Sequence, residues 1–268
     1  MQEQNNFTNQ IAQTTKQVRA AHLFLWNSLK NFGLEQDFEH DIFHSGFIGV
    51  ENSIITTRSG NLRAKQYSTK PEWTKIFINW FYEAGLKSGD NIFISSSSSF
   101  PAMLCSCLIA AENFGLQIKL CVSLGSSSWG ANRPELLSAD ILKILHDNGF
   151  IKTLPEFYTL GGINENGGGF SREAIKILSR VENIFINHDL EEAVKIKLPF
   201  INNSRLVISI GGNASSMGRD LNALNIPSGL NFSSDNAGNG IAGIALRNNI
   251  PVIHVSKIIE LAKKFDLD

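Results

Sequence analysis

The chain has 268 residues, with 24 Lys and Arg against 25 Asp and Glu, so its formal net charge is −1. The balanced charge, with no basic run longer than the pair Lys263–Lys264, is not that of a dedicated nucleic-acid-binding protein. The three cysteines, Cys105, Cys107 and Cys121, cannot all pair, and their apolar surroundings predict buried, reduced thiols. A hydrophobic content of 43% excludes intrinsic disorder of the whole chain.

No segment has the ~18 consecutive apolar residues that a membrane-spanning helix needs. Residues 1–16 are polar and lack the apolar centre of a signal peptide. We therefore expect the chain as it stands to be soluble and cytoplasmic. A membrane-associated or extracytoplasmic location is expected if a natural N-terminal anchor precedes it.

The first predicted element is a helix, in which apolar residues recur every three to four positions from Val18 to Leu29 and Gly33 is the stop. Two short extended runs follow at 47–50 and 54–57, and Pro71 opens a second helix that ends at Gly85. Residues 1–85 are thus expected to be a helical and irregular extension packed on the core, although one continuous domain is also compatible with the pattern.

From residue 86 to 268, short apolar strands alternate with helices. The strands are predicted at 91–94, 118–122, 157–160, 184–186, 206–210 and 252–255. The helices are predicted at 101–114, from 134 to the residues before 149, at 171–181, 189–197, 241–247 and 256–265. Continuous apolar strands separated by helices predict an α/β fold with a doubly wound, mostly parallel sheet in three Rossmann-like layers.

Small polar residues follow nearly every predicted strand. In open parallel sheets, ligands bind beyond the carboxyl ends of the strands, where hydroxyl and N–H groups hold carboxylates or phosphates. Any one such loop is ordinary turn chemistry, whereas several at one edge predict a cleft. The candidate ligand-binding residues are Ser98, Ser126, Ser127, Ser128, Trp129, Asn132, Gly161, Gly162, Gly211, Gly212, Asn213 and Lys65. The polar peptide 53–60, together with Lys65, is a candidate lip of this cleft or else an edge hairpin.

A serine nucleophile is a second interpretation of the same edge. Ser97 and Ser99 are the candidate nucleophiles, and His254 is the best-placed base by topology, although a buried structural histidine is the commoner case. A G-x-S-x-G nucleophile elbow is absent from the strand–helix turns.

Cofactor and metal motifs are weak in this chain. Neither the dinucleotide-binding G-x-G-x-x-G nor the P-loop motif follows a strand, so no cofactor is indicated. His40, Asp41 and His44 form a His-Asp-x-x-His cluster whose two histidines would share a helix face and could hold a metal, but a loop or surface position is expected there, and no metal site is predicted.

Several strings occur in a characteristic order. They are IGVENSIITT at 48–57, Ala64-Lys65, Gly89-Asp90, SSSFPA at 97–102, SLGSSSWGAN at 123–132, GGNA at 211–214 and IPVIH at 250–254. From about residue 45 to the end, the chain resembles the poly-γ-glutamate system protein family, which accompanies the ligase and export components of bacterial poly-γ-glutamate capsules. Ser98 departs from this pattern, which has a glycine there, and the loop after Gly162 lacks the Asp that members often carry.

The resemblance implies an accessory role in poly-γ-glutamate synthesis, export or processing. The expected ligand is a γ-glutamyl chain, or a small carboxylate or phosphate, at the carboxyl edge of the sheet, and the expected protein partners are the membrane-bound ligase and export proteins. Because the edge offers mostly neutral donors, a short segment or chain end is favoured over a long polyanion. Two alternatives stay open: a hydrolase or transferase acting on γ-glutamyl bonds, and a non-catalytic scaffold for the ligase.

Overall fold

The computed structural model describes residues 2–220, 222–233 and 237–267, and its centre is a seven-stranded sheet. The strands are β1 (Asn91–Ser97), β2 (Gln117–Ser123), β5 (Phe157–Thr159), β6 (Ile184–Phe185), β7 (Leu206–Ile210), β8 (Gly229–Asn231) and β9 (Val252–Val255). Their order is β6-β5-β2-β1-β7-β9-β8, and every pairing is parallel except that of β8 with β9. The predicted mostly parallel sheet is confirmed.

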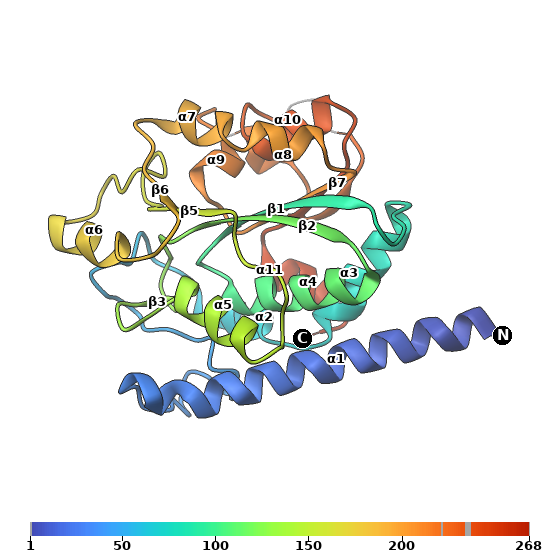
Figure 1. Ribbon diagram of the computed structural model, residues 1–268, viewed down its shortest axis with the longest axis horizontal. Helices are drawn as coiled ribbons and strands as arrows, with labels where there is room; N and C mark the ends of the chain where they lie inside the picture. Colours follow the sequence, from blue (N-terminus) through green and yellow to red (C-terminus); the bar gives the residue numbers. More distant parts are fainter. Residues whose placement is uncertain (1, 221, 234–236, 268) are drawn as a thin grey trace.

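Helices cover both faces of the sheet (Figure 1). The helices on one side are α2 (Leu62–Ser68), α3 (Trp73–Glu83), α4 (Pro101–Phe114), α5 (Ser138–Asp147) and α11 (Ile258–Lys264). The helices on the other side are α7 (Leu190–Lys195), α8 (Leu198–Asn202), α9 (Ala214–Met217) and α10 (Ile241–Arg247), while α6 (Arg172–Leu178) lies at the β6 end. The predicted three-layer, Rossmann-like α/β architecture is therefore confirmed.

The N-terminal segment is built onto the layer that contains α4. Helix α1 (Gln2–Ser28) runs across the outside of this layer (Figure 1), and its buried Leu25 and Trp26 belong to the same apolar core as Phe77 of α3 and Leu108 of α4. Residues 1–85 thus contribute to the core of the sheet rather than forming a core of their own. No helix among the described residues is long and apolar enough to cross a membrane.

Side chains of β1 alternate between the two faces. Ile92 and Ile94 point into the core beneath α3 and α4, whereas Phe93 packs on the other face against Phe200 of α8, with 5.6 Å between ring centroids. The same alternation sends Ser95 and Ser97 to the face of α8 and α9.

Several local predictions are confirmed by capping contacts. Ser171 and Asp189 accept backbone hydrogen bonds from Ala174 and Glu192 at the starts of α6 and α7. The 3-10 turn Leu29–Phe32, which continues from α1, ends at Gly33, and α4 ends at Gly115, both with positive φ.

Other predictions were wrong at the element boundaries. Strand β1 continues to Ser97, so the first three serines of the run lie in the sheet and not in a loop. No helix starts at Pro134, because residues 132–137 form the hairpin of β3 (Asn132–Arg133) and β4 (Leu136–Leu137) and α5 begins only at Ser138. The sequence pattern also missed α2, α8, α9 and β8, which are too short for a clear hydrophobic period.

Candidate functional site

The chain reverses direction across the sheet between β1 and β7. From β1 the sheet grows through β2 toward β6, whereas β7 leads to β9 on the opposite side. Such a switch point opens a crevice outside the carboxyl ends of the two strands, where doubly wound proteins bind ligands. A cavity of about 280 Å³ lies at this place, and we call it the switch-point pocket.

Five segments line the switch-point pocket. Ser97 and Ser99 come from the end of β1, Ser123 and Gly125 from the end of β2, and residues 212–214 from the loop after β7. The remaining wall consists of residues 56–58 and of the glycine-rich loop 162–170. The structure therefore brings together loops that the sequence analysis assigned to one edge, including Ser97, Ser99, Gly162, Gly212 and Asn213.

A row of hydroxyl groups crosses the sheet at the floor of the pocket. Ser97, Ser123 and Thr159 are register partners on β1, β2 and β5, so their side chains point to the same face. Ser97 and Ser123 line the pocket, whereas Thr159 donates a hydrogen bond of 3.0 Å to Glu165. The floor thus offers neutral donors and acceptors.

The polar peptide 53–60 lies against the loop that follows β2. The Thr57 N–H donates to the Ser126 carbonyl at 2.7 Å. The Asn132 side chain accepts from the Val50 N–H at 2.9 Å and donates to the Val50 carbonyl and to Thr56 Oγ1. The Asn132 side chain therefore holds this peptide beside the pocket, which is where the predicted lip would lie.

Arg58 is the cation of the pocket wall. Its side chain is exposed, and none of the carboxylates that the structure describes forms an ion pair with it. A Cβ on Gly212 would stand 2.9 Å from Arg58 Nη2, so the glycine leaves room for the guanidinium. An unpaired guanidinium over a hydroxyl-lined floor matches the donor pattern that carboxylates prefer.

Lys65 is a buried cation next to this wall. It is 2% exposed, and its Nζ donates to Ser127 Oγ at 2.8 Å and to the Ser99 carbonyl. The Nζ also lies 3.9 Å from the centroid of the Phe100 ring. Burial, with a smaller contribution from the positive charge of Arg58, lowers the pKa of Lys65 from 10.5 to about 7.

The other predicted serines hold the loops together. Ser98 Oγ donates to the Ser123 carbonyl at 2.8 Å and contacts Ser138 Oγ. Ser126 Oγ donates to the carbonyls of Ser98 and Ser127, while the Ser128 N–H donates to the Arg58 carbonyl at 3.0 Å and its Oγ lies 3.5 Å from the same oxygen. None of these three residues lines the pocket.

Close backbone approaches shape the pocket walls. Gly161 has a φ of +77°, and a Cβ on it would stand 2.3 Å from the Gly125 nitrogen. Gly211 has the same φ, and a Cβ there would stand 2.3 Å from Ser97 Oγ. The positive φ favours glycine at both positions, and at Gly161 a side chain would also push the backbone of the neighbouring loop away.

Trp129 and the predicted His40–His44 cluster lie outside the pocket. The Trp129 ring stacks on His40, with centroids 4.5 Å apart, and His44 stacks on a different tryptophan, Trp26. The Asp41 carboxylate accepts hydrogen bonds from Ser45 and Gly46 instead of facing the two histidines. The three residues lie in an irregular, non-helical segment, as the loop interpretation expected.

His254 lies deeper in the sheet than the pocket. It pairs with Ser209 of β7, which pairs with Ser95 of β1, two residues before Ser97. Two strand spacings of about 4.8 Å separate β9 from β1, which exceeds hydrogen-bonding reach. The structure therefore does not bring His254 to Ser97 or Ser99, and burial lowers the pKa of His254 to about 4.

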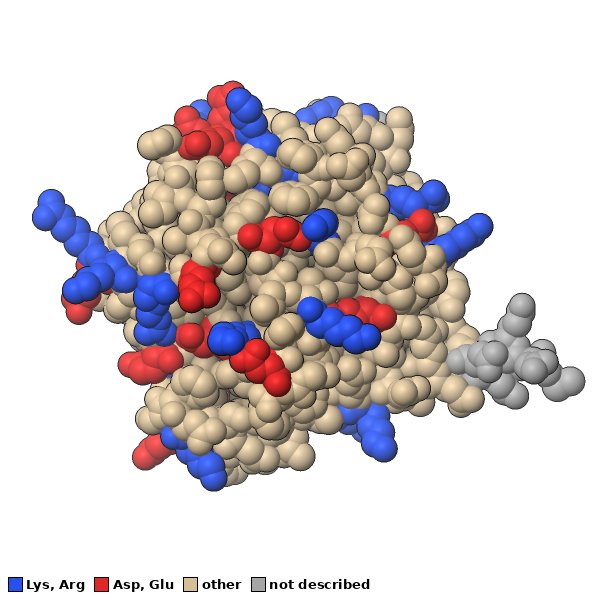
Figure 2. Space-filling model, in the orientation of Figure 1, with Lys and Arg blue, Asp and Glu red and all other residues tan. Residues whose placement is uncertain are grey.

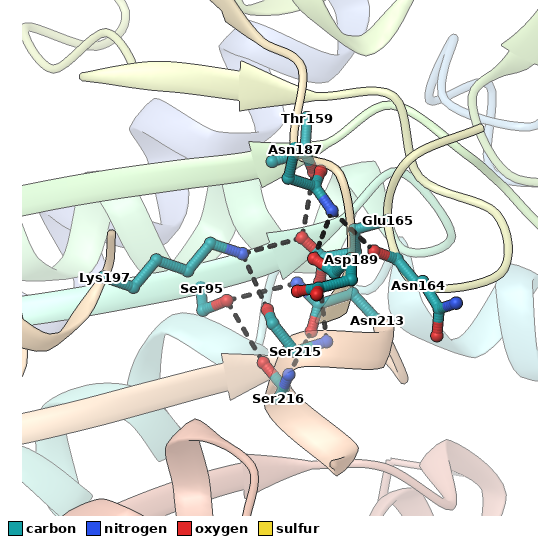
Figure 3. A network of polar contacts seen from close by, with 10 residues as sticks. All are labelled: Ser95, Thr159, Asn164, Glu165, Asn187, Asp189, Lys197, Asn213, Ser215 and Ser216. Atoms are coloured by element: carbon teal, nitrogen blue, oxygen red, sulfur yellow. Dashed lines mark hydrogen bonds and ion pairs between the residues drawn. The ribbon is translucent and has the colours of Figure 1, made fainter. Parts of the chain in front are cut away.

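A buried ion pair that the sequence analysis missed supports the glycine-rich loop (Figure 3). Lys197 Nζ lies 2.8 Å from Glu165 Oε2 and 2.7 Å from Ser215 Oγ, and Glu165 Oε1 accepts from the Ser215 N–H. A neighbouring set of hydrogen bonds links Asn213 to Ser95 and Ser216 (Figure 3). Nothing in the Asn/Gly-rich string around Glu165 signalled burial.

The cysteines take no part in the site. Cys105, Cys107 and Cys121 are free and buried, as predicted, and burial raises the pKa of all three thiols.

Comparisons with known proteins add no further assignment to this geometry. No family model, no curated protein and no solved structure matches the chain.

Proposed function

We propose that the switch-point pocket binds the carboxylate of a short γ-glutamyl segment or chain end. In this role the protein serves as an accessory component of bacterial poly-γ-glutamate synthesis, export or processing. The observation that carries the binding proposal is the unpaired guanidinium of Arg58 above the hydroxyl groups of Ser97, Ser99 and Ser123. The γ-glutamyl assignment comes from the sequence resemblance.

The size of the pocket favours a small ligand. A volume of about 280 Å³ lies just below the range of small-molecule sites, which is about 300–1,000 Å³. On the face that Figure 2 shows, acidic and basic side chains are interspersed, with wide areas that carry neither. Because a long polyanion needs a continuous basic surface, these features support recognition of a segment rather than of an extended polymer.

The proposal is tested by calorimetric titration of the full chain with glutamate, with γ-glutamyl oligomers of increasing length and with inorganic phosphate. We expect the oligomers to bind and the affinity to stop rising after the first few residues. The Arg58→Gln protein should bind about 10- to 100-fold more weakly, since a charge-assisted hydrogen bond is lost. Arg172→Gln, at an exposed arginine that opens α6, is the matched control.

Three results would contradict the proposal. If phosphate binds and the γ-glutamyl oligomers do not, the pocket recognises a different anion. If affinity grows steadily with polymer length, the surface and not the pocket holds the chain. If Arg58→Gln and Arg172→Gln bind equally well, Arg58 is not the anchor of the carboxylate.

A further inference from the structure

Lys65 and Ser127 form a hydrogen-bonded pair behind the wall of the switch-point pocket. Lys65 Nζ is 2.8 Å from Ser127 Oγ, and the two residues are 2% and 5% exposed. The partners of the ammonium are a hydroxyl, the Ser99 carbonyl and the Phe100 ring, and no described carboxylate pairs with it. A buried lysine without a counter-ion is costly as a structural device, because the charge is desolvated and uncompensated.

Burial and the charge of Arg58 disfavour the charged form of Lys65 and outweigh the Ser99 carbonyl and the Phe100 ring, which favour it. Arg58 is the charged group that acts on the lysine, and it has the same sign. Phe100, whose ring faces Nζ, is the N-cap of the 14-residue helix α4, so the positive end of that helix dipole is also close by. With a pKa of about 7, a large fraction of Lys65 is neutral at physiological pH and can accept a proton.

Ser127 does not itself line the switch-point pocket, but it is hydrogen-bonded to a residue that does. Its N–H donates to Ser99 Oγ at 3.1 Å, and Ser99 lines the pocket. A Cβ on Gly60 would stand 2.6 Å from the Ser128 carbonyl oxygen and 3.1 Å from Ser127 Oγ, so only a glycine can pack this closely against the hydroxyl. Arg58, two residues earlier, faces the same pocket.

We infer that Ser127 and Lys65 are a nucleophile and its general base, and that the protein hydrolyses amide-linked γ-glutamyl groups held in the switch-point pocket. The substrate class rests on the proposed function, whereas the nucleophile–base pair rests on the geometry. Serine–lysine pairs are an established variant of the serine–histidine arrangement in acyl transfer. The pair replaces His254, which the fold places two strands from β1.

The reaction balances with water as the only co-reactant. Ser127 Oγ bonds to the amide carbonyl carbon while its proton passes to neutral Lys65 Nζ and the π electrons move to oxygen. When the C–N bond breaks, Lys65 returns the proton to the departing amine and an ester remains on Ser127. Water then attacks the ester, its proton passes through Lys65 to Ser127 Oγ, and a carboxylic acid is released.

The first experiment is labelling of the full chain with a fluorophosphonate, with the modified serine located by peptide mass spectrometry. We expect one labelled residue, Ser127, and a labelling rate that rises as pH increases through about 7, since only neutral Lys65 accepts the proton. Lys65→Met should label at least about 100-fold more slowly and lose this pH dependence. Labelling at another serine, or at none, overturns the inference.

The second experiment is hydrolysis of γ-glutamyl p-nitroanilide, followed by release of p-nitroaniline. Ser127→Ala and Lys65→Met should lose activity by at least about 100-fold, whereas Ser106→Ala and Lys75→Met should retain it. Ser106 is a buried serine without a side-chain partner and Lys75 is an exposed lysine of α3, so they control for the two kinds of substitution. Circular dichroism verifies the fold of each variant, and the pH profile of the wild-type chain tests the base if Lys65→Met does not fold.

The two proposals fail in different ways. If the oligomers bind to the wild-type chain but Ser127 is neither labelled nor needed for hydrolysis, the nucleophile–base pair is wrong and the binding function stands. If Ser127 is labelled with the expected pH dependence but γ-glutamyl oligomers do not bind, the pair is right and the proposed ligand is wrong. Titration of the Ser127→Ala protein with the oligomers separates binding from turnover directly.

Discussion

Glu165 and Lys197 form an ion pair in which both side chains are almost completely buried, with Oε2 2.8 Å from Nζ. Glu165 belongs to the glycine-rich loop that lines the switch-point pocket, and Lys197 lies immediately before α8. The Ser215 N–H and Oγ complete the network, so the ion pair connects the loop after β5 to the first turn of α9, which follows β7. It fixes two opposite walls of the pocket relative to each other.

Breaking this ion pair should destabilise the protein strongly. Glu165→Gln leaves Lys197 buried without a counter-ion, and we expect the free energy of unfolding in urea to fall by about 3–5 kcal/mol. Replacing both partners, as Glu165→Gln with Lys197→Met, should recover part of this loss. Asp147→Asn, which breaks the exposed pair with Lys143, should have no measurable effect. Equal effects of Glu165→Gln and Asp147→Asn would contradict the assigned role.

The Glu165–Lys197 ion pair also predicts that the protein loses stability at acidic pH. Although burial by itself raises the pKa of Glu165, the charge of Lys197 and the hydrogen bonds from Lys197 and Ser215 lower it overall, below the ordinary 4.5. The stabilisation is therefore fully present above about pH 4.5 and is lost as the pH falls through the lower pKa of the folded state. The difference in unfolding free energy between the wild-type and Glu165→Gln proteins should shrink over that range. A constant difference would show that Glu165 does not titrate with folding.

The lowered pKa of Lys65 predicts that the stability of the protein rises with pH in the alkaline range. Its pKa is about 7 in the folded protein and about 10.5 in the unfolded chain, so the unfolded state binds more protons between these values. Stability attributable to Lys65 should rise across this window by up to about 1.4 kcal/mol per pH unit. We expect the wild-type protein to gain stability relative to Lys65→Met from about pH 7 to about pH 9 in urea unfolding. Parallel pH profiles for these two proteins would mean that Lys65 keeps its ordinary pKa.

The contact between Gly161 and Gly125 predicts a matched pair of glycine substitutions. Gly161→Ala adds a Cβ 2.3 Å from the Gly125 nitrogen at a φ of +77°, whereas Gly85→Ala adds one at a φ of +70° with no atom within 4 Å. The Gly85 variant measures the cost of the backbone conformation alone, about 1–2 kcal/mol. Gly161→Ala should lower the free energy of unfolding by about 1–3 kcal/mol more than Gly85→Ala does, because the backbone of the neighbouring loop must move. It should also weaken ligand binding, since Gly125 and Gly162 line the pocket, and equal unfolding energies for the two variants would argue against the close approach.

The strongest local patterns predicted the fold well. Leu206–Ile210 is a continuous apolar run and became a fully buried strand beside β1. The hairpin at 132–137 escaped prediction because it depends on distant partners: the Asn132 side chain is bonded to Val50 and Thr56, more than 70 residues earlier in the chain. Pro134 favours the first turn of a helix by its own preference, but those contacts place it in the hairpin instead.

For the site, sequence and tertiary structure decided different things. Glycine and serine after the strands already predicted an edge lined by small polar residues, because parallel strands deliver their carboxyl ends to one side of the sheet. Only the tertiary structure decided which residues act together. The folding of residues 56–65 over that edge places Arg58 at the pocket and Lys65 against Ser127, while the strand order moves His254 away. The physical reason is that local preference follows from neighbours in the chain, whereas a buried charge and its partners are set by packing between segments far apart in sequence.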